Sequence, residues 1–247
     1  VFFYITYSII IYTMKIDVLD AGFIEAIDHL GDDLTVVNSA RVSFGKRKTV
    51  YEDGDKKLVT YLAKNKHYSP FRHMVVQFHI KAPEFVMRQW YKHVVGIETT
   101  NSSATKDHAW NEISGRYVPV KDFYKPLVWR QQSTDNKQGS GEDMPENINQ
   151  ECQEIFDNFM TNVEESYENL LKLGVAKEQA RTILPLNQYT EVYWTASFQA
   201  IMNFIELRTE KTAQWEIQQY AKAIKQIVSE IYPETTNIWF ETHGLQE

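Results

Sequence analysis

The sequence predicts an α+β fold, in which a small antiparallel sheet with flanking helices is joined to a helical C-terminal half. Two observations predict it. Strand-like alternation of apolar and polar residues appears near the start of the chain, at Met14–Asp20 and Arg72–Pro83. From Glu84 onward the hydrophobic period becomes helical. No internal repeat or linker separates two units, so residues 14–232 are expected to form one domain.

The two ends of the chain are expected to lie outside this domain. Residues 1–13 are apolar and uncharged, but they are shorter than the roughly 20 residues of a membrane-spanning helix. They also lack the basic start and cleavage site of a signal peptide. We interpret them as an N-terminal extension of unassigned role, and residues 233–247 as a C-terminal tail.

The N-terminal third is expected to alternate strands and helices. Four apolar residues share one face of the second strand and should point into a core: Met74, Val76, Phe78 and Ile80. Between the two strands, Phe23–Asp33 and Asp53–His67 are predicted to be helices, separated by a basic loop at Gly45–Lys48.

The segment Glu84–Val95 is predicted to be an amphipathic helix. At about 100° per residue, one arc holds Phe85, Arg88, Gln89, Lys92 and His93. The other arc is mainly apolar and includes Val86, Met87 and Trp90. The polar arc either faces water or presents its cations, amide and imidazole to an anionic ligand.

Beyond this helix, a connection interrupted by Pro119 and Pro126 leads to a predicted surface loop around Ser133–Gly141. Four helices are then expected: Gln150–Leu173, Lys177–Leu184, Glu191–Thr209 and Thr212–Tyr232. A glycine or a proline follows three of them, as is typical of a helix end.

Composition limits the class of protein. Hydrophobic residues at 43% and charged residues at 24% are typical of a globular chain, so disorder is not expected for most of it. A net charge of −7 argues against a nucleic-acid polymer as the main partner, although a local cluster of Arg and Lys can still bind a small anion. Cys152 is the only cysteine, which excludes a disulfide framework, and its polar helical surroundings favour a passive side chain.

The common cofactor and hydrolase motifs are absent. The sequence has no GxGxxG, GxxxxGK[ST] or GxSxG motif, so a Rossmann, P-loop or serine-hydrolase site is not expected. His67, His73 and His79 lack the spacing of a helical metal pair and have no carboxylate cluster beside them. We therefore expect no metal site.

Asn111–Tyr117, with the sequence NEISGRY, is the motif that points most directly to ligand binding. Its Ser-Gly turn frees backbone N–H groups beside a hydroxyl and Arg116, a combination that can hold a phosphate. Glu112 can accept a hydrogen bond from a ribose hydroxyl or an arginine. Many surface turns have similar sequences, so the motif alone does not decide the function.

Arg208 is the third candidate for ligand binding, after the polar arc of Glu84–Val95 and the motif Asn111–Tyr117. The predicted helix Glu191–Thr209 places it among Trp194, Ile201 and Phe204, with Ser197 on the same side. An arginine in an apolar surround needs an anionic or carbonyl partner. The alternative is that Arg208 simply suits the negative end of the helix dipole, with its stem reaching solvent.

Taken together, these segments resemble the flavin-dependent thymidylate synthases. The similarity runs from Met14 to about Tyr232. Eight segments match in family order: Met14–Asp20, Ala40–Phe44, Ser69–His73, Phe78–Trp90, Asn111–Tyr117, Ala180–Thr190, Met202–Arg208 and Ala213–Ala221. The resemblance implies methylation of dUMP to dTMP, with methylene-tetrahydrofolate as carbon donor, NADPH as reductant and FAD as cofactor. It also implies a cytoplasmic homotetramer (in the host cytoplasm if the chain is viral) whose active sites are shared between subunits.

The resemblance also assigns residues. The positions that match dUMP-binding residues are Gln89, Glu112, Ser114, Gly115, Arg116, Arg181 and Arg208. Those that match FAD-binding residues are Ser43, Lys92, His93, Asn203 and Leu207. The catalytic candidates are Arg208, which would polarise the uracil ring, His67 and His93 for folate and flavin handling, and Ser114. Ser114 is a nucleophile by type, but the family reaction uses reduced flavin instead of a covalent enzyme intermediate.

This sequence departs from the family mainly on the flavin side. The family's Arg-His-Arg is replaced by Lys92-His93-Val94, and nineteen residues, instead of a short spacer, separate Val94 from Ser114. Four further positions differ: Arg72 replaces a common Glu, Ser197 an Asn, Gln199 an Arg and Thr212 a His. We infer a variant branch with a rebuilt flavin pocket.

The extra residues lie at about 96–110. One hypothesis is that Lys106 or His108 supplies part of the lost positive charge to FAD or NADPH. The alternative is that the insertion only decorates the surface of the tetramer.

Three other functions are compatible with parts of the sequence to different degrees. The folate-dependent thymidylate synthase with a cysteine nucleophile is excluded, because Cys152 lacks the surroundings that activate a thiolate. A family member without turnover, acting as a nucleotide-binding scaffold, is the main alternative. A helical interaction protein without a ligand would leave the ordered arginine positions unexplained.

Overall fold

The computed structural model describes residues 14–93 and 109–245. Its centre is a five-stranded antiparallel sheet in the order β1-β2-β3-β7-β4. The strands are β1 (Met14–Val18), β2 (Gly22–Leu30), β3 (Val75–Pro83), β4 (Trp110–Glu112) and β7 (Tyr189–Ser197). The expected α+β class, with a small antiparallel sheet, is confirmed.

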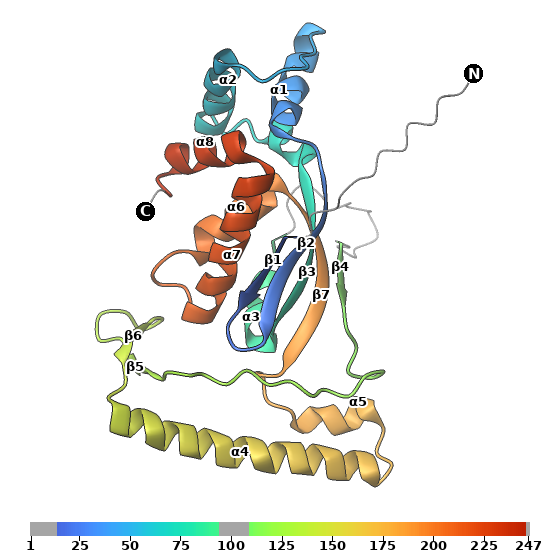
Figure 1. Cartoon of the computed structure of the whole chain (residues 1–247), viewed down its shortest axis with the longest axis vertical. Coiled ribbons are helices and arrows are strands. Elements are labelled where there is room, and N and C mark those ends of the chain that lie inside the picture. The colour runs from blue at the N-terminus through green and yellow to red at the C-terminus, as the bar shows by residue number, and fades with distance from the viewer. Residues whose placement is uncertain (1–13, 94–108, 246–247) are drawn as a thin grey trace, which may run out of the picture.

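Helices surround this sheet in three groups (Figure 1). Beside it lie α3 (Glu84–Trp90), α6 (Phe198–Arg208) and α7 (Trp215–Ile231). At one end of the molecule are α1 (Asp33–Arg41), the 3-10 turn η1 (Val42–Phe44), α2 (Asp53–Lys64), the 3-10 turn η2 (Ser69–His73) and α8 (Pro233–His243). At the other end are α4 (Glu146–Lys172), α5 (Lys177–Ala180) and η3 (Arg181–Ile183), and the hairpin of β5 (Arg130–Gln132) and β6 (Ser140–Asp143) lies nearby.

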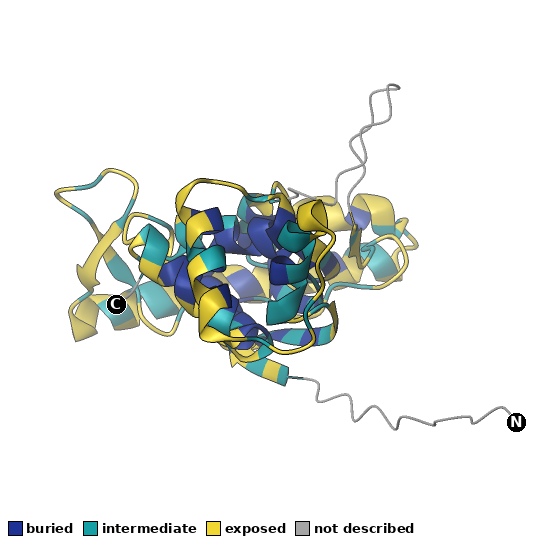
Figure 2. Cartoon of the chain, turned by 90° about the horizontal axis from the view of Figure 1, so that it is seen from above, coloured by how far each residue is buried: buried dark blue, intermediate teal, exposed yellow. Residues whose placement is uncertain are grey.

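The core lies between the sheet and the helices. Figure 2 shows the buried residues on the inner sides of the elements and exposed residues outside. All four apolar residues expected on one face of β3 are fully buried: Met74, Val76, Phe78 and Ile80. The rings of Trp90, Trp194 and Phe204 contact one another among these elements, with centroids 4.4–5.9 Å apart. No helix in the described part of the chain is long and apolar enough to cross a membrane.

The helix expected at Phe23–Asp33 is wrong, because these residues form most of β2. The spacing of Phe23, Ala26, Ile27 and Leu30 mimics a helical face. In the fold, however, β2 pairs with β1 on one side and β3 on the other, and alternate residues are buried. Pairing along both edges satisfies the backbone, and Leu30 is left 66% exposed.

The first part of the helix expected at Glu191–Thr209 is also wrong. Residues up to Ser197 belong to β7, which pairs with β3 along its whole length. Val192, Trp194 and Ala196 are buried on alternate positions, as in a strand. Ser197 ends the strand and caps α6, since its hydroxyl accepts a hydrogen bond from Ala200 N at 3.2 Å. Trp194 therefore lies in the sheet, on a different element from Arg208.

The other helices follow the expectation with shifted ends. The helix predicted from Gln150 begins at Glu146, and Gly174 after it adopts the left-handed conformation (φ 83°) expected at a helix end. The helix expected at Glu84–Val95 ends at Trp90, and residues 94–95 lie outside the described chain. The expected loop at Ser133–Gly141 is the exposed turn of the β5–β6 hairpin and includes the first residues of β6.

Residues 233–247, expected to be a tail, contain α8, which packs into the core. Pro233 occupies the first turn of α8, where a proline is tolerated. Trp239 is 1% exposed and meets Phe71 and Phe198 edge-on. The predicted end of α7 before Pro233 is correct, but the chain continues as structure.

Candidate active site

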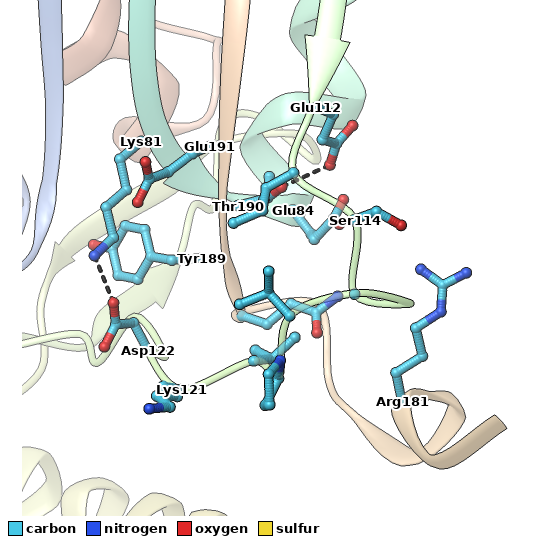
Figure 3. A pocket seen from close by; sticks show the side chains of 16 residues that line it. Lys81, Glu84, Glu112, Ser114, Lys121, Asp122, Arg181, Tyr189, Thr190 and Glu191 are labelled. Atoms are coloured by element: carbon cyan, nitrogen blue, oxygen red, sulfur yellow. Dashed lines mark hydrogen bonds and ion pairs between the residues drawn. The ribbon is translucent and has the colours of Figure 1, made fainter. Parts of the chain in front are cut away.

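A cavity of about 570 Å³ lies where the end of β3, the start of β7 and the loop after β4 meet. Figure 3 shows its lining. Four of the expected nucleotide-binding residues line it: Glu112, Ser114, Gly115 and Arg181. They come from segments far apart in the sequence, so the fold itself brings them together.

The Ser-Gly turn and Arg181 form one side of the cavity. Tyr117 N and Val118 N donate to the backbone oxygen of Ser114 at 2.9 and 3.1 Å, which closes the turn. A Cβ added to Gly115 would lie 3.2 Å from Arg181 Cδ, a tight contact that would push the arginine away by a few tenths of an ångström. Arg181 is exposed and has no ion-pair partner among the described residues. Backbone N–H groups, a hydroxyl and a cation with free donors suit a phosphate.

Glu112 is held by Thr190, whose hydroxyl donates to Glu112 Oε1 at 2.7 Å. Glu84 lines the same cavity and was not identified from the sequence. Burial raises the pKa of Glu84, and the negative charge of Glu112 raises it further. A carboxyl with a raised pKa beside an acceptor can form hydrogen bonds to sugar hydroxyls or to the polar groups of a base. The only sequence signal was an acidic residue directly after a buried strand.

Arg116 faces another way. Its guanidinium carbon lies 5.4 Å from the centroid of the Tyr117 ring, and one of its terminal nitrogens donates to the Tyr117 hydroxyl at 3.3 Å. It does not line the cavity, although its backbone N–H donates to Ser114 Oγ at 3.3 Å. The side chain is exposed, and a bound anion could recruit it only by rotation away from Tyr117.

A second cluster joins the end of α3 to the end of α6. A terminal nitrogen of Arg208 donates to the backbone oxygen of Gln89 at 3.0 Å, and Gln89 Nε2 donates to Gln214 Oε1 at 2.8 Å. Arg208 Nε is buried and has no hydrogen-bond partner. Such an orphaned donor is unusual and fits a site that a ligand completes. The expected apolar surround of Arg208 is present in part, through Phe204 and the α6 residues before it.

His93 belongs to this second cluster. Its ring meets Phe204 edge-on, with centroids 5.2 Å apart. Burial, assisted by the positive charge of Arg208, lowers the pKa of His93 to about 4. The imidazole is therefore neutral at physiological pH, so one ring nitrogen can donate a hydrogen bond and the other can accept one.

The remaining expected residues lie partly beside the second cluster and partly at the end of the molecule that holds α1 and α2. Asn203 and Leu207 lie on α6, and Lys92 follows α3 as an exposed cation. Ser43 in η1 and His67 before η2 are exposed near α1 and α2, at the end opposite Arg181 in Figure 1. His67 stacks on Tyr61, with ring centroids 6.0 Å apart. A single chain thus does not enclose all the expected site residues, and Lys106 and His108 lie outside the described residues.

Comparison with known proteins decides the family. The family model described as thymidylate synthase complementing protein matches residues 25–234. The chain is 40% identical to the flavin-dependent thymidylate synthase of Thermosipho africanus over 223 residues, which are 90% of this chain and 92% of the relative. The chain belongs to the flavin-dependent thymidylate synthase family. The family resemblance found in the sequence is therefore confirmed.

Other relatives agree. A flavin-dependent thymidylate synthase of Thermus thermophilus is 41% identical over 237 residues, covering 94% of this chain and 80% of the relative. Among solved structures, the UMP/dUMP methylase PolB from Streptomyces cacaoi, bound with 5-Br dUMP, superposes with a TM-score of 0.76 at 27% identity. That comparison covers 92% of this chain and 97% of the other. A second structure of PolB holds 5-Br UMP.

Proposed function

We propose that the protein methylates dUMP to dTMP, with FAD as its cofactor, methylene-tetrahydrofolate as carbon donor and NADPH as reductant. One observation carries the proposal most strongly. The cavity gathers Glu112, Ser114, Gly115 and Arg181, which are four of the residues expected to bind dUMP. They lie in a chain whose relatives, named for this activity, match it over about nine-tenths of its length.

The phosphate of dUMP would bind where Arg181 meets the Ser-Gly turn. The arginine has donors that no carboxylate of the described chain neutralises, and the glycine allows a close approach. Arg116 would add a second cation after rotating from Tyr117. Hydrogen bonds from charged donors to phosphate are about twice as strong as neutral ones, so this end supplies much of the affinity.

Arg208 would act on the uracil ring. Its buried Nε lacks a partner, while one of its terminal nitrogens donates to the backbone oxygen of Gln89. A guanidinium in a water-poor site stabilises negative charge on a carbonyl oxygen more strongly than it would in water. Neutral His93 beside it can share a proton without adding a second full charge.

The residues expected for FAD fit an anionic cofactor with a flat ring. Lys92 supplies a cation, Asn203 a polar amide, and Leu207 an apolar surface that is 52% exposed. Ser43 would add a hydroxyl from the neighbouring end of the molecule. When bound, FAD supplies hydride transfer, which no side chain of the protein can perform. The protein's own part is to hold the reactants in place and to exclude water.

We further propose that the working form is a homotetramer with shared sites. Support comes from the positions of the expected dUMP residues: Arg181 and the Ser-Gly turn line the cavity, whereas Gln89 and Arg208 do not. Association would bring the Arg181 side of one subunit to the Arg208 side of another. The N-terminal extension at 1–13 and a single domain that begins at residue 14 and includes α8 are proposals about organisation.

The visible spectrum of the purified protein tests the flavin chemistry. Protein reconstituted with FAD should be yellow, should bleach with NADPH in the absence of oxygen, and should regain its colour with dUMP and methylene-tetrahydrofolate. A colourless protein that binds dUMP but cannot be reconstituted with FAD would contradict the proposal and favour a nucleotide-binding scaffold.

A further inference from the structure

Arg72 and Gln199 form a pair that the nucleotide site does not use. Arg72 Nε donates to Gln199 Oε1 at 2.7 Å, although the two residues are 127 positions apart. Gln199 is 6% exposed, and its amide is fixed in the first turn of α6. Arg72 is exposed in η2, and no carboxylate among the described residues forms an ion pair with it. Its two terminal nitrogens are therefore available to an anion.

The core holds this arginine in place. Phe71, the residue before it, is fully buried and stacks on Phe198, with ring centroids 6.0 Å apart. Phe198 N donates to the backbone oxygen of Met74 at 2.7 Å, which ties the end of η2 to the start of α6. Because backbone and Nε are both fixed, little conformational entropy is lost when the remaining donors bind a ligand.

Both positions differ from the family pattern. The resemblance implies Glu at the position of Arg72 and Arg at the position of Gln199. The direct hydrogen bond shows that both positions serve one location. The cation is therefore kept, but it is carried by η2 instead of α6. This change compensates for one of the apparent losses on the flavin side.

The pair also lies at one end of a continuous face of α6. Gln199, Asn203 and Leu207 are spaced four residues apart, so they follow one another along the same side of the helix. Asn203 and Leu207 are expected to contact FAD, and the ring of His93 meets Phe204 of the same helix. A ligand that lies along the face would reach Arg72 at the N-terminal end of α6.

We propose that Arg72 is an FAD-binding residue whose terminal guanidinium nitrogens pair with the pyrophosphate of the cofactor. The pyrophosphate is the anionic part of FAD, and the planar guanidinium fork matches paired phosphate oxygens. The inference rests on the proposed function, because it assumes that the chain binds FAD. It assigns one residue of the rebuilt pocket, which carries on η2 the cation that the family pattern places on α6.

The affinity of the apoprotein for FAD and for riboflavin, measured by quenching of flavin fluorescence, tests the proposal. Arg72→Gln should weaken FAD binding about tenfold or more, since a charge-assisted bond is lost. Its affinity for riboflavin, which has no phosphate, should stay within about twofold of wild type. Lys57→Gln removes the same charge from an exposed site on α2 and should change neither affinity. Arg72 is exposed, so the variant should keep the wild-type Tm.

A charge exchange adds a second readout. Arg72→Glu should weaken FAD binding further, and Arg72→Glu combined with Gln199→Arg should recover part of the loss by restoring the family arrangement. FAD affinity unchanged by Arg72→Gln would overturn the proposal and leave Arg72 as a partner of Gln199 alone. Equal losses for FAD and riboflavin would overturn it as well. A wild-type protein that binds no FAD would overturn the proposed function together with this inference.

Discussion

Gly115 is the residue at which backbone geometry most directly limits the nucleotide site. A methyl group there would lie 3.2 Å from Arg181 Cδ, so the arginine would have to move. Gly115→Ala should weaken dUMP binding by about 1 kcal/mol, roughly fivefold, as titration calorimetry would measure. Gly54→Ala is the matched control, because its added methyl group meets nothing within 4 Å. Equal affinities for the Gly115 variant and wild type would show that Arg181 does not bind the phosphate in this position.

At His93, burial lowers the pKa to about 4, below the value near 6.5 of an unfolded histidine. Between these values the unfolded state binds more protons, so this contribution to stability is complete above pH 6.5 and is lost as the pH falls toward 4. Across this window the free energy of unfolding of wild type, measured by chemical denaturation, should fall by about 1–2 kcal/mol more than that of His93→Gln, after allowance for solvent screening. Parallel pH profiles for the two proteins would contradict a buried neutral His93.

Residues within one short motif could be predicted from the sequence pattern, and Arg181 could be predicted through the family resemblance, whereas other partners from distant segments could not. The Ser-Gly-Arg turn was identified from neighbouring side chains, and the cavity contains its Ser114 and Gly115. Glu84 was missed because its role depends on Glu112, which only the fold brings near. The Arg72–Gln199 bond joins two elements with no shared sequence pattern. The two residues come together only because the fold places η2 against α6.

Among the elements, α1, the basic loop and α2 are held together by the buried carboxylate of Asp55. Arg41 and Lys48 donate to its two oxygens at 2.9 and 2.6 Å, and the side chain is 0% exposed. Burial raises the pKa of Asp55, but the hydrogen bonds from Lys48, Glu52 N and Arg41 outweigh this effect and lower it overall. The resulting stability is present above the unfolded pKa and is lost as the pH falls through the folded value.

Asp55→Asn should lower the free energy of unfolding by about 2–4 kcal/mol, because it leaves two cations without their shared anion. Urea denaturation at neutral pH would measure this change. Asp53→Asn, an exposed carboxylate in the same first turn of α2, should change stability by less than about 0.5 kcal/mol. If the two variants are equally stable, Asp55 does not anchor the basic loop.

Helix α8 is expected to contribute strongly to stability. Trp239 is 1% exposed and contacts rings from η2 and α6, so Trp239→Ala should cost about 3–5 kcal/mol of stability. Asn237→Ala, on the exposed side of the same helix, is the control. Thermal unfolding that is unchanged by Trp239→Ala would return residues 233–247 to the status of a tail.

Elements whose own period was unambiguous could be predicted, and those decided by pairing could not. The apolar face of β3 and the long helix α4 have a clear period of two or of 3.6 residues. In β2, apolar residues satisfy a helical spacing, and hydrogen bonds to two neighbouring strands decide the outcome. In β7, the strand runs directly into α6 without a glycine or proline to mark the change. Tertiary pairing overrides local preference in both cases.

For the whole molecule, the separation of the Arg181 and Arg208 clusters leads to a test by complementation. Arg181→Gln and Arg208→Gln should each be inactive, but dissociating and reassembling a mixture should restore part of the activity. Hybrid assemblies would then contain some sites with both wild-type arginines. Light scattering should give the mass of four chains. A mixture as inactive as its components would indicate that each site is formed within one chain.

The central claim for this protein is that it transfers a methyl group to dUMP. Purified protein should be incubated with dUMP, FAD, NADPH and methylene-tetrahydrofolate, and the nucleotide should be analysed by mass spectrometry. We expect dTMP, no product when FAD or the folate is omitted, and no product from folded Arg181→Gln protein at a dUMP concentration that saturates wild type. Unchanged dUMP in the complete mixture, from protein shown to bind both FAD and dUMP, would contradict the assignment.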